Sequence, residues 1–117
     1  MGVDLKVLAS HFRERRGEFL ATATLRLDRD EGLLAQLTLD AEPCLVRPLP
    51  PGLKVGHYEE EGLRWDEADR QGHPLTFTTP AELRRLRVPD DLAPWNQAVL
   101  AFLLALPPDA RIVLYWC

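Results

Sequence analysis

Residues 95–117, WNQAVLAFLLALPPDARIVLYWC, are the most informative part of the sequence for the fold. Its first part is an apolar run that ends at Leu106, and its last part, residues 112–116, is apolar without interruption. A surface helix shows one apolar stripe and a half-exposed strand alternates, so a segment that lacks both patterns needs cover on more than one side. This cover comes either from the rest of the chain or from a partner chain.

Prolines set the limits of the two elements in this stretch. Residues 107–108, both proline, end the apolar helix, and Pro94 fits its first turn, where no hydrogen bond within the helix is lost. Asp90 or Asp91 is the expected N-cap. We therefore predict a helix that starts after this cap and a final strand over residues 111–116, central to the sheet.

Residues 79–82, Thr-Pro-Ala-Glu, carry the clearest local helix signal in the chain. The threonine caps the helix, the proline takes the first helical position, and the glutamate reaches back as in a capping box. This pattern predicts a short helix that runs to about Arg87 and stops before Pro89.

The middle of the chain is typical of a meander of short strands. Residues 53–58, 63–65 and 75–78 have strand-forming side chains and are separated by acidic or glycine-containing turns. The proline-rich segment before them permits only a short edge strand near Leu45 and Val46, because proline cannot donate to a ladder.

The N-terminal part of the chain has the spacing of a helix. Leu5, Leu8 and Phe12 share one helical stripe. Asp4 can cap this helix and Gly17 can end it. We therefore predict a first helix between these two residues.

Alternating apolar residues over 19–27 and 33–39, joined by turn residues at 28–32, predict a β-hairpin. The complete order is then helix, two strands, three short strands, two helices and a last strand. This order is typical of the α+β class, with an antiparallel sheet of about five to six strands that carries three helices on one face. The length favours a single domain over residues 1–117.

Charge and hydrophobicity restrict the location and the partners of the protein. Fourteen basic and eighteen acidic residues give a net charge of -4, which disfavours nucleic acid and anionic membranes as partners. Arginine groups at 13–16 and 84–87 keep a nucleic-acid-binding regulator as a weaker alternative. The apolar run before Pro107 is shorter than the roughly 20 residues of a membrane span, and the N-terminus lacks the pattern of a signal peptide. We therefore expect a cytoplasmic protein without a membrane partner.

Cys44 and Cys117 are too few for a structural zinc site, so we expect two free, mostly buried thiols. A disulfide between them would require an oxidising compartment or a hyperthermophile. Lysine, asparagine and serine are scarce beside arginine and proline, a composition typical of a thermophilic or high-GC bacterium.

The candidate ligand-binding residues all lie in the predicted meander, and they are His57, Trp65, Asp66, Asp69 and His73. Two imidazoles and a carboxylate could hold a divalent ion if His57 and His73 converge, but their spacing is not diagnostic, and we expect neither a metal nor another cofactor. An aromatic ring beside carboxylates and a histidine could also form a binding edge. The competing interpretation is a solvated acidic turn with Trp65 packed inward.

Recognisable catalytic motifs are missing from the sequence, which has no glycine-rich phosphate loop, nucleophile elbow or dinucleotide fingerprint. We therefore expect a non-enzymatic protein that acts through protein contacts as a homodimer. The last helix contains Leu100, Phe102, Leu103 and Leu104, and it would expose large side chains on its outer face if only one face packs on the sheet. A two-fold contact would cover these side chains. The alternatives are cover by the protein's own chain, and a ligand-binding or metal-assisted enzyme built on residues 57–73, whose ligand the sequence does not identify.

Overall fold

Strand β8 (Ile112–Trp116) lies at the centre of a five-stranded antiparallel sheet, whose order is β3-β1-β8-β7-β4. The computed structural model describes residues 4–117. The other strands of this central sheet are β1 (Leu5–Ala9), β3 (Ala23–Arg26), β4 (Arg47–Pro48) and β7 (Thr76–Thr78). A second sheet, of order β2-β5-β6, consists of β2 (Glu18–Leu20), β5 (Lys54–Glu59) and β6 (Gly62–Asp66).

The side chains of β8 point alternately into two hydrophobic cores. Ile112 and Leu114 belong to the core beneath the helices, whereas Val113 and Tyr115 belong to the core beneath the second sheet. All four side chains are at most 1% exposed. A strand that is buried on both faces does not alternate between apolar and polar residues, which explains the uninterrupted apolar sequence of β8. The predicted central strand is confirmed, and its cover comes from this chain.

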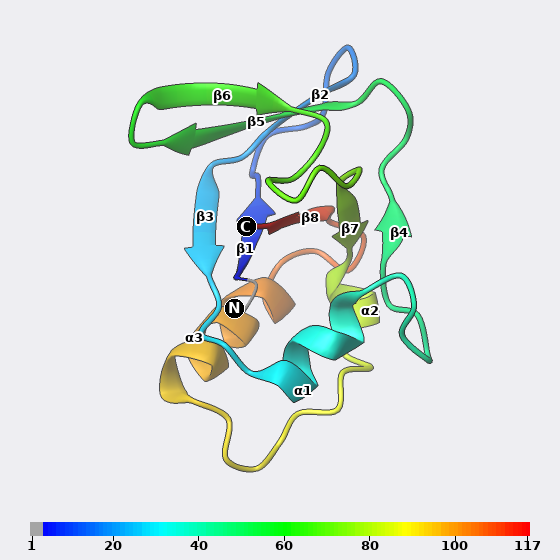
Figure 1. The fold of residues 1–117 in the computed structure, drawn as a ribbon, viewed down its shortest axis with the longest axis vertical. Coiled ribbons are helices and arrows are strands. Elements are labelled where there is room, and N and C mark those ends of the chain that lie inside the picture. The colour runs from blue at the N-terminus through cyan, green and yellow to red at the C-terminus, as the bar shows by residue number, and fades with distance from the viewer. Residues whose placement is uncertain (1–3) are drawn as a thin grey trace.

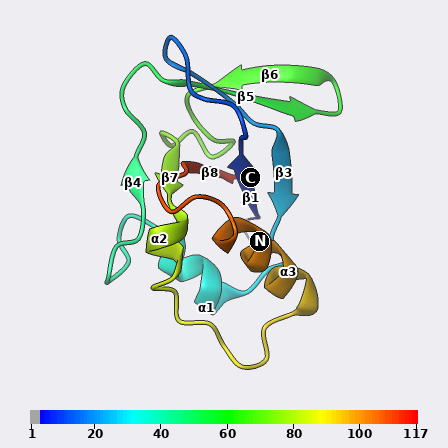
Figure 2. The same cartoon turned by 180° about the vertical axis from the view of Figure 1, so that it is seen from behind.

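Helices cover one face of the central sheet, and they are α1 (Glu31–Leu34), the 3-10 helix η1 (Ala35–Leu37), α2 (Pro80–Leu83) and α3 (Pro94–Leu104). Val99 and Leu103 of α3 share a core with Leu5 and Val7 of β1. In Figures 1 and 2 the helices lie at one end of the molecule and the β5–β6 hairpin lies at the other. Within residues 4–117, no helix has the length and apolar character to cross a membrane. The predicted α+β class is confirmed, with three α-helices in the described part of the chain.

The second sheet covers part of the other face of the central sheet. Phe19 of β2 and Val55 of β5 are opposite each other in register and share a core with Val113 and Tyr115. Strands β2 and β5 are parallel, whereas β5 and β6 form an antiparallel hairpin that turns at Gly62, where a φ of 115° favours glycine. The predicted short strands in the middle of the chain are confirmed as β5, β6 and β7.

Residues 4–17 do not form the predicted first helix, because they contain β1 and the loop before β2. Leu5 faces the helices and Leu8 faces the second sheet. A strand that is buried on both faces carries apolar residues at many spacings. The spacing of three between Leu5 and Leu8 therefore resembles that of a helical stripe. Phe12, the third member of the expected stripe, lies in the loop and is 55% exposed.

The predicted hairpin over residues 19–39 is also wrong. Its first half is divided between β2 and β3, which belong to different sheets. Its second half is α1 followed by η1, and the Asp30 side chain caps α1 by accepting a hydrogen bond from the backbone N–H of Leu33 at 3.0 Å. Leu34 and Leu37 are buried at helical spacing. The turn residues therefore begin a helix instead of closing a hairpin.

The cap at Thr79 is confirmed, because its hydroxyl oxygen accepts a hydrogen bond from the backbone N–H of Glu82 at 3.3 Å. The helix is shorter than predicted, since α2 ends at Leu83 and not near Arg87. A turn follows it, in which the backbone N–H of Leu86 donates to the carbonyl oxygen of Leu83.

The start of α3 is held by Asn96 and not by an aspartate cap. The N-cap is Ala93, which makes no side-chain hydrogen bond, so the predicted cap at Asp90 or Asp91 is wrong. The buried Asn96 side chain accepts from the backbone N–H of Asp28 at 2.7 Å and donates to its carbonyl oxygen at 3.0 Å. These two hydrogen bonds tie α3 to the segment that follows β3.

The proline-rich segment and the cysteines differ in detail from expectation. The edge strand predicted near Leu45 and Val46 is β4, which begins one residue later. Both cysteines are free, as expected, but Cys44 is exposed and Cys117 is half-buried.

Replacing Leu103 by alanine tests the burial of α3 against the sheet. Leu103 is 1% exposed, so Leu103→Ala should lower the free energy of unfolding by about 2 to 5 kcal/mol, because lost contacts and the remaining cavity both contribute. Leu39→Ala removes the same atoms from a side chain that is 53% exposed, and should change the free energy by less than about 0.5 kcal/mol. Urea denaturation measures both. A loss below about 1 kcal/mol for Leu103→Ala would contradict the burial.

Candidate functional site

His57 and Asp66, two of the predicted site residues, meet on the inner face of the β5–β6 hairpin. They belong to neighbouring strands, and the imidazole Nε2 of His57 lies 2.8 Å from Oδ2 of Asp66. The His57 side chain is fully buried. An Nε2–H that donates to the carboxylate holds the imidazole ring in one orientation.

Four further residues surround this pair and complete what we call the inner cluster, which consists of His57, Glu59, Arg64, Asp66, Arg70 and Tyr115. Arg64 Nε lies 3.1 Å from Asp66 Oδ2, and Arg70 donates a hydrogen bond to Glu59. The hydrogen bond to the Asp66 carboxylate raises the pKa of Arg64, and the negative charge of Glu59 raises the pKa of Arg70. The cluster therefore pairs each of its carboxylates with a guanidinium group.

Strand alternation explains why these side chains gather. His57 and Glu59 are two residues apart in β5, and Arg64 and Asp66 are two residues apart in β6, so all four project from one face of the hairpin. This face lies over β8, where the ring centroid of Tyr115 is 4.8 Å from that of His57. Burial raises the pKa of the Tyr115 phenol.

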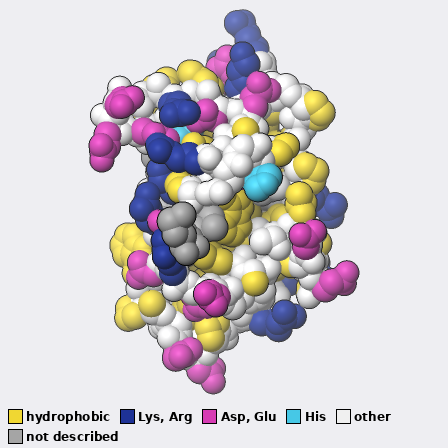
Figure 3. All heavy atoms as spheres, viewed as in Figure 1, with side chains coloured by type: hydrophobic (Ala, Val, Ile, Leu, Met, Phe, Trp, Pro, Cys, Tyr) yellow, Lys and Arg dark blue, Asp and Glu magenta, His cyan; other side chains and the backbone are white. Residues whose placement is uncertain are grey.

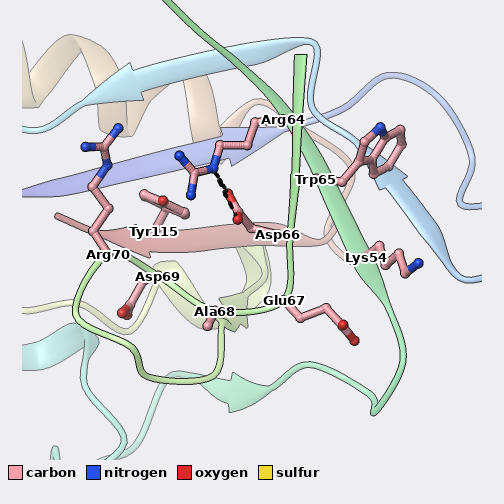
Figure 4. Close-up of a pocket in the computed structure, with 9 residues that line it drawn as sticks. All are labelled: Lys54, Arg64, Trp65, Asp66, Glu67, Ala68, Asp69, Arg70 and Tyr115. Atoms are coloured by element: carbon pink, nitrogen blue, oxygen red, sulfur yellow. Dashed lines mark hydrogen bonds and ion pairs between the residues drawn. The ribbon is translucent and has the colours of Figure 1, made fainter. Parts of the chain in front are cut away.

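The histidine of the inner cluster is closed to a substrate. A pocket of 470 Å³ opens beside the cluster, and His57 is not among the nine residues that line it (Figure 4). Nδ1 of His57 and Oε1 of Glu59 are 3.9 Å apart, and both are buried without a hydrogen-bond partner in the described part of the chain. A general base must lie within hydrogen-bond reach of its substrate. The contacts of the cluster instead hold the hairpin against β8.

Trp65 lies on the opposite, outer face of the hairpin. It is 41% exposed, and its ring rests on Gly56, its partner in register on β5. A Cβ atom at position 56 would come within 2.8 Å of the ring, so the glycine provides the space that the indole occupies. The competing interpretation, in which Trp65 packs inward, is therefore wrong.

Asp69 and His73 lie in the loop between β6 and β7, which also contains Arg70 of the inner cluster. Asp69 lines the pocket shown in Figure 4, and His73 does not. Asp69 shapes this loop, because its Oδ1 accepts hydrogen bonds from the backbone N–H groups of Gln71 at 2.9 Å and His73 at 3.1 Å. His73 is exposed. No three or more His, Cys, Asp or Glu side chains within residues 4–117 are grouped so as to hold a metal ion. The structure therefore does not bring His57, His73 and a carboxylate together.

The outward face of α3 is a second candidate site. Trp95 is 48% exposed and Phe102 is 41% exposed, and Ala98 and Ala105 are exposed between and beyond them. Their spacing of three, four and three residues places them in one row along the helix, which we call the α3 stripe. No charged residue occurs within residues 92–108. The outer face of a surface helix normally carries charged and polar side chains, so this face lacks the usual solvent-facing composition.

Sequence reasoning identified only part of each site. On α3 it predicted that large side chains stay exposed on the outer face, but it did not say which residues these are; they are Trp95 and Phe102, whereas Leu100 and Leu103 are buried. In the inner cluster it missed Glu59, Arg64, Arg70 and Tyr115. A period-two interpretation of β5 and β6 would have grouped the missed side chains of the hairpin with His57 and Asp66.

Comparisons with known proteins assign neither site. The chain matches no protein-family model, no curated protein and no solved structure. Both candidate sites therefore stand on their geometry.

The buried Tyr115 phenol should make the protein less stable at alkaline pH. Burial raises the pKa of its phenol above the value of about 10 expected in the unfolded chain, so the folded protein holds this proton more tightly. The resulting stabilisation is complete below about pH 10 and is lost as the pH rises through the pKa of the folded state. Urea midpoints should therefore fall above about pH 10, and Tyr115→Phe should reduce the fall.

The other tyrosine provides the control for this pH profile. Tyr58 is 63% exposed, and Tyr58→Phe should retain the alkaline fall of the wild type. Equal falls in the wild type and in Tyr115→Phe would show that the buried phenol does not contribute.

Proposed function

We propose that the protein is a non-enzymatic homodimer that acts through protein contacts, and that the α3 stripe is the contact between the two copies. The observation that carries this proposal is that two large aromatic side chains, Trp95 and Phe102, stay 48% and 41% exposed on a helix without charged residues. The Trp95 indole N–H donates to the Arg26 carbonyl oxygen at 2.6 Å, which fixes its ring at the surface. Complete burial of one such side chain contributes about 1.5 to 3 kcal/mol. In a two-fold dimer the same patch of each copy covers that of the other, so one self-complementary surface is sufficient.

The order of side chains along the α3 stripe suits an antiparallel pair of helices. From its N-terminal end the stripe reads Trp95, Ala98, Phe102 and Ala105, so large and small side chains alternate. With a two-fold axis near Leu100, Trp95 faces the partner's Ala105 and Phe102 faces the partner's Ala98. Every large side chain then meets a small one, an arrangement that lets facing layers interdigitate. A parallel pair would place large side chains against each other.

Charge also favours the α3 stripe as the contact. Each copy carries a net charge of -4, so two copies repel each other. A contact centred on residues 92–108 brings no charged side chain to its middle. Association there avoids both close repulsion and the removal of water from charged groups.

The size of the stripe sets the expected affinity. Helix α3 has 11 residues and is therefore about 16 Å long. A single pair of helices of this length buries less than the roughly 1,600 Å² of a standard interface. The dimer should accordingly be weak, with a Kd on the order of micromolar.

Exchanging a large and a small side chain tests the antiparallel arrangement. Phe102→Ala should raise the Kd at least about tenfold, because it removes the same aromatic contact at two symmetry-related places. Ala98→Phe should also raise the Kd, although it adds apolar surface, because its new ring would meet the partner's Phe102. The double variant Ala98→Phe/Phe102→Ala restores a large side chain opposite a small one, and it should regain dimerisation.

Light scattering coupled to size exclusion, over a series of concentrations, measures these changes. Phe12→Ala is the matched control, because Phe12 is 55% exposed outside the α3 stripe, and it should leave the dimer unchanged. The proposal fails if the wild type remains at the monomer mass of 13.3 kDa throughout. It also fails if Ala98→Phe associates more strongly than the wild type, as a nonspecific apolar surface would.

A further inference from the structure

A pocket of 560 Å³ opens on a part of the surface that neither the inner cluster nor the α3 stripe explains. It lies between the loop after η1, strands β4 and β7, the β6–β7 loop and the end of β8, and no residue of α3 lines it. Figure 3 shows hydrophobic side chains in a hollow near the centre of this face. Its apolar lining consists of Leu37, Leu39, Pro48, Pro74 and Trp116. The volume falls within the range of about 300 to 1,000 Å³ that is typical of small-molecule sites.

The charged side chains around this pocket are acidic. Asp40 and Asp69 both line it, and no lysine or arginine does. Asp40 is exposed, whereas Asp69 is 7% exposed and shapes the loop that forms one wall. In Figure 4 the Asp69 side chain points away from Arg64 and Asp66 of the inner cluster. A concave site with two carboxylates and no lysine or arginine attracts cations and repels anions.

Trp116 gives the same pocket a second feature that suits a cation. Trp116 is one of the residues that line the pocket, and it is half-buried. The face of an indole ring attracts an ammonium group within about 6 Å, and it also packs well against a second aromatic ring. The prolines and leucines around it offer further apolar contact. The pocket therefore combines a surface for a flat apolar group with groups that favour a positive charge.

From these features we propose that the pocket binds a small aromatic amine in its protonated form, with its ring against Trp116 and its ammonium group towards Asp40. This site is independent of self-association, because it uses no residue of the α3 stripe. It includes Asp69 and His73, two of the ligand-binding residues predicted from the sequence, and it excludes His57 and Trp65.

Nuclear magnetic resonance of the tryptophan side chains locates a bound amine directly. The chain has three tryptophans, and their indole N–H signals can be assigned by replacing each with phenylalanine. Phenethylamine should shift the signal of Trp116 and leave those of Trp65 and Trp95 in place. Phenylpropionate carries the same ring with a carboxylate in place of the ammonium group, and it should bind at least about tenfold more weakly.

Two conservative variants test the role of the carboxylate. Asp40→Asn should weaken the binding of phenethylamine about fivefold. Because Asp40 is exposed, this substitution should not disturb folding. Asp109→Asn removes a charge from another exposed position outside the pocket and should leave the binding unchanged. The proposal is overturned if the Trp116 signal does not shift, if the amine and the acid bind equally, or if the two variants behave alike.

Discussion

The rest of the structure depends on the burial of β8 on both of its faces. Because Ile112 and Leu114 point one way and Val113 and Tyr115 the other, two separate covers are needed. Helices provide the first cover and the small second sheet provides the other. Strand β1, which pairs with β8, is also buried on both faces and has apolar side chains in both cores. The architecture is therefore a way to enclose one strand from both sides.

The two covers solve this problem with different chemistry, and the candidate sites follow from the difference. On the hairpin side, Tyr115 lies beneath charged side chains, so carboxylates and guanidinium groups are paired with each other in the inner cluster. On the helix side the cover is apolar, with Val99 and Leu103 of α3 turned to the sheet. On the outer side of α3 the chain covers Trp95 and Phe102 only in part. The excess of apolar residues in 95–117 therefore has two origins, one internal to the fold and one at its surface.

The sequence was most informative where a local signal has a single physical meaning. The threonine cap at Thr79, the strands around His57 and the uninterrupted apolar strand at the end of the chain were all predicted correctly. The prediction was wrong where one pattern is compatible with two structures. The leucines of β1 have the spacing of a helix, and Asp30 begins a helix in a segment whose residues are typical of a turn. The inner cluster could be predicted only in part, because the approach of Arg70 and Tyr115 depends on how distant segments pack.

The proposed antiparallel contact between two copies of the α3 stripe can be observed directly. Isotope-filtered nuclear magnetic resonance on a mixture of labelled and unlabelled protein detects contacts between copies and suppresses those within one chain. We expect an intermolecular contact between the ring of Phe102 and the methyl group of the partner's Ala98. Intermolecular contacts between the two Phe102 rings, or no contact involving α3 at concentrations well above micromolar, would contradict it.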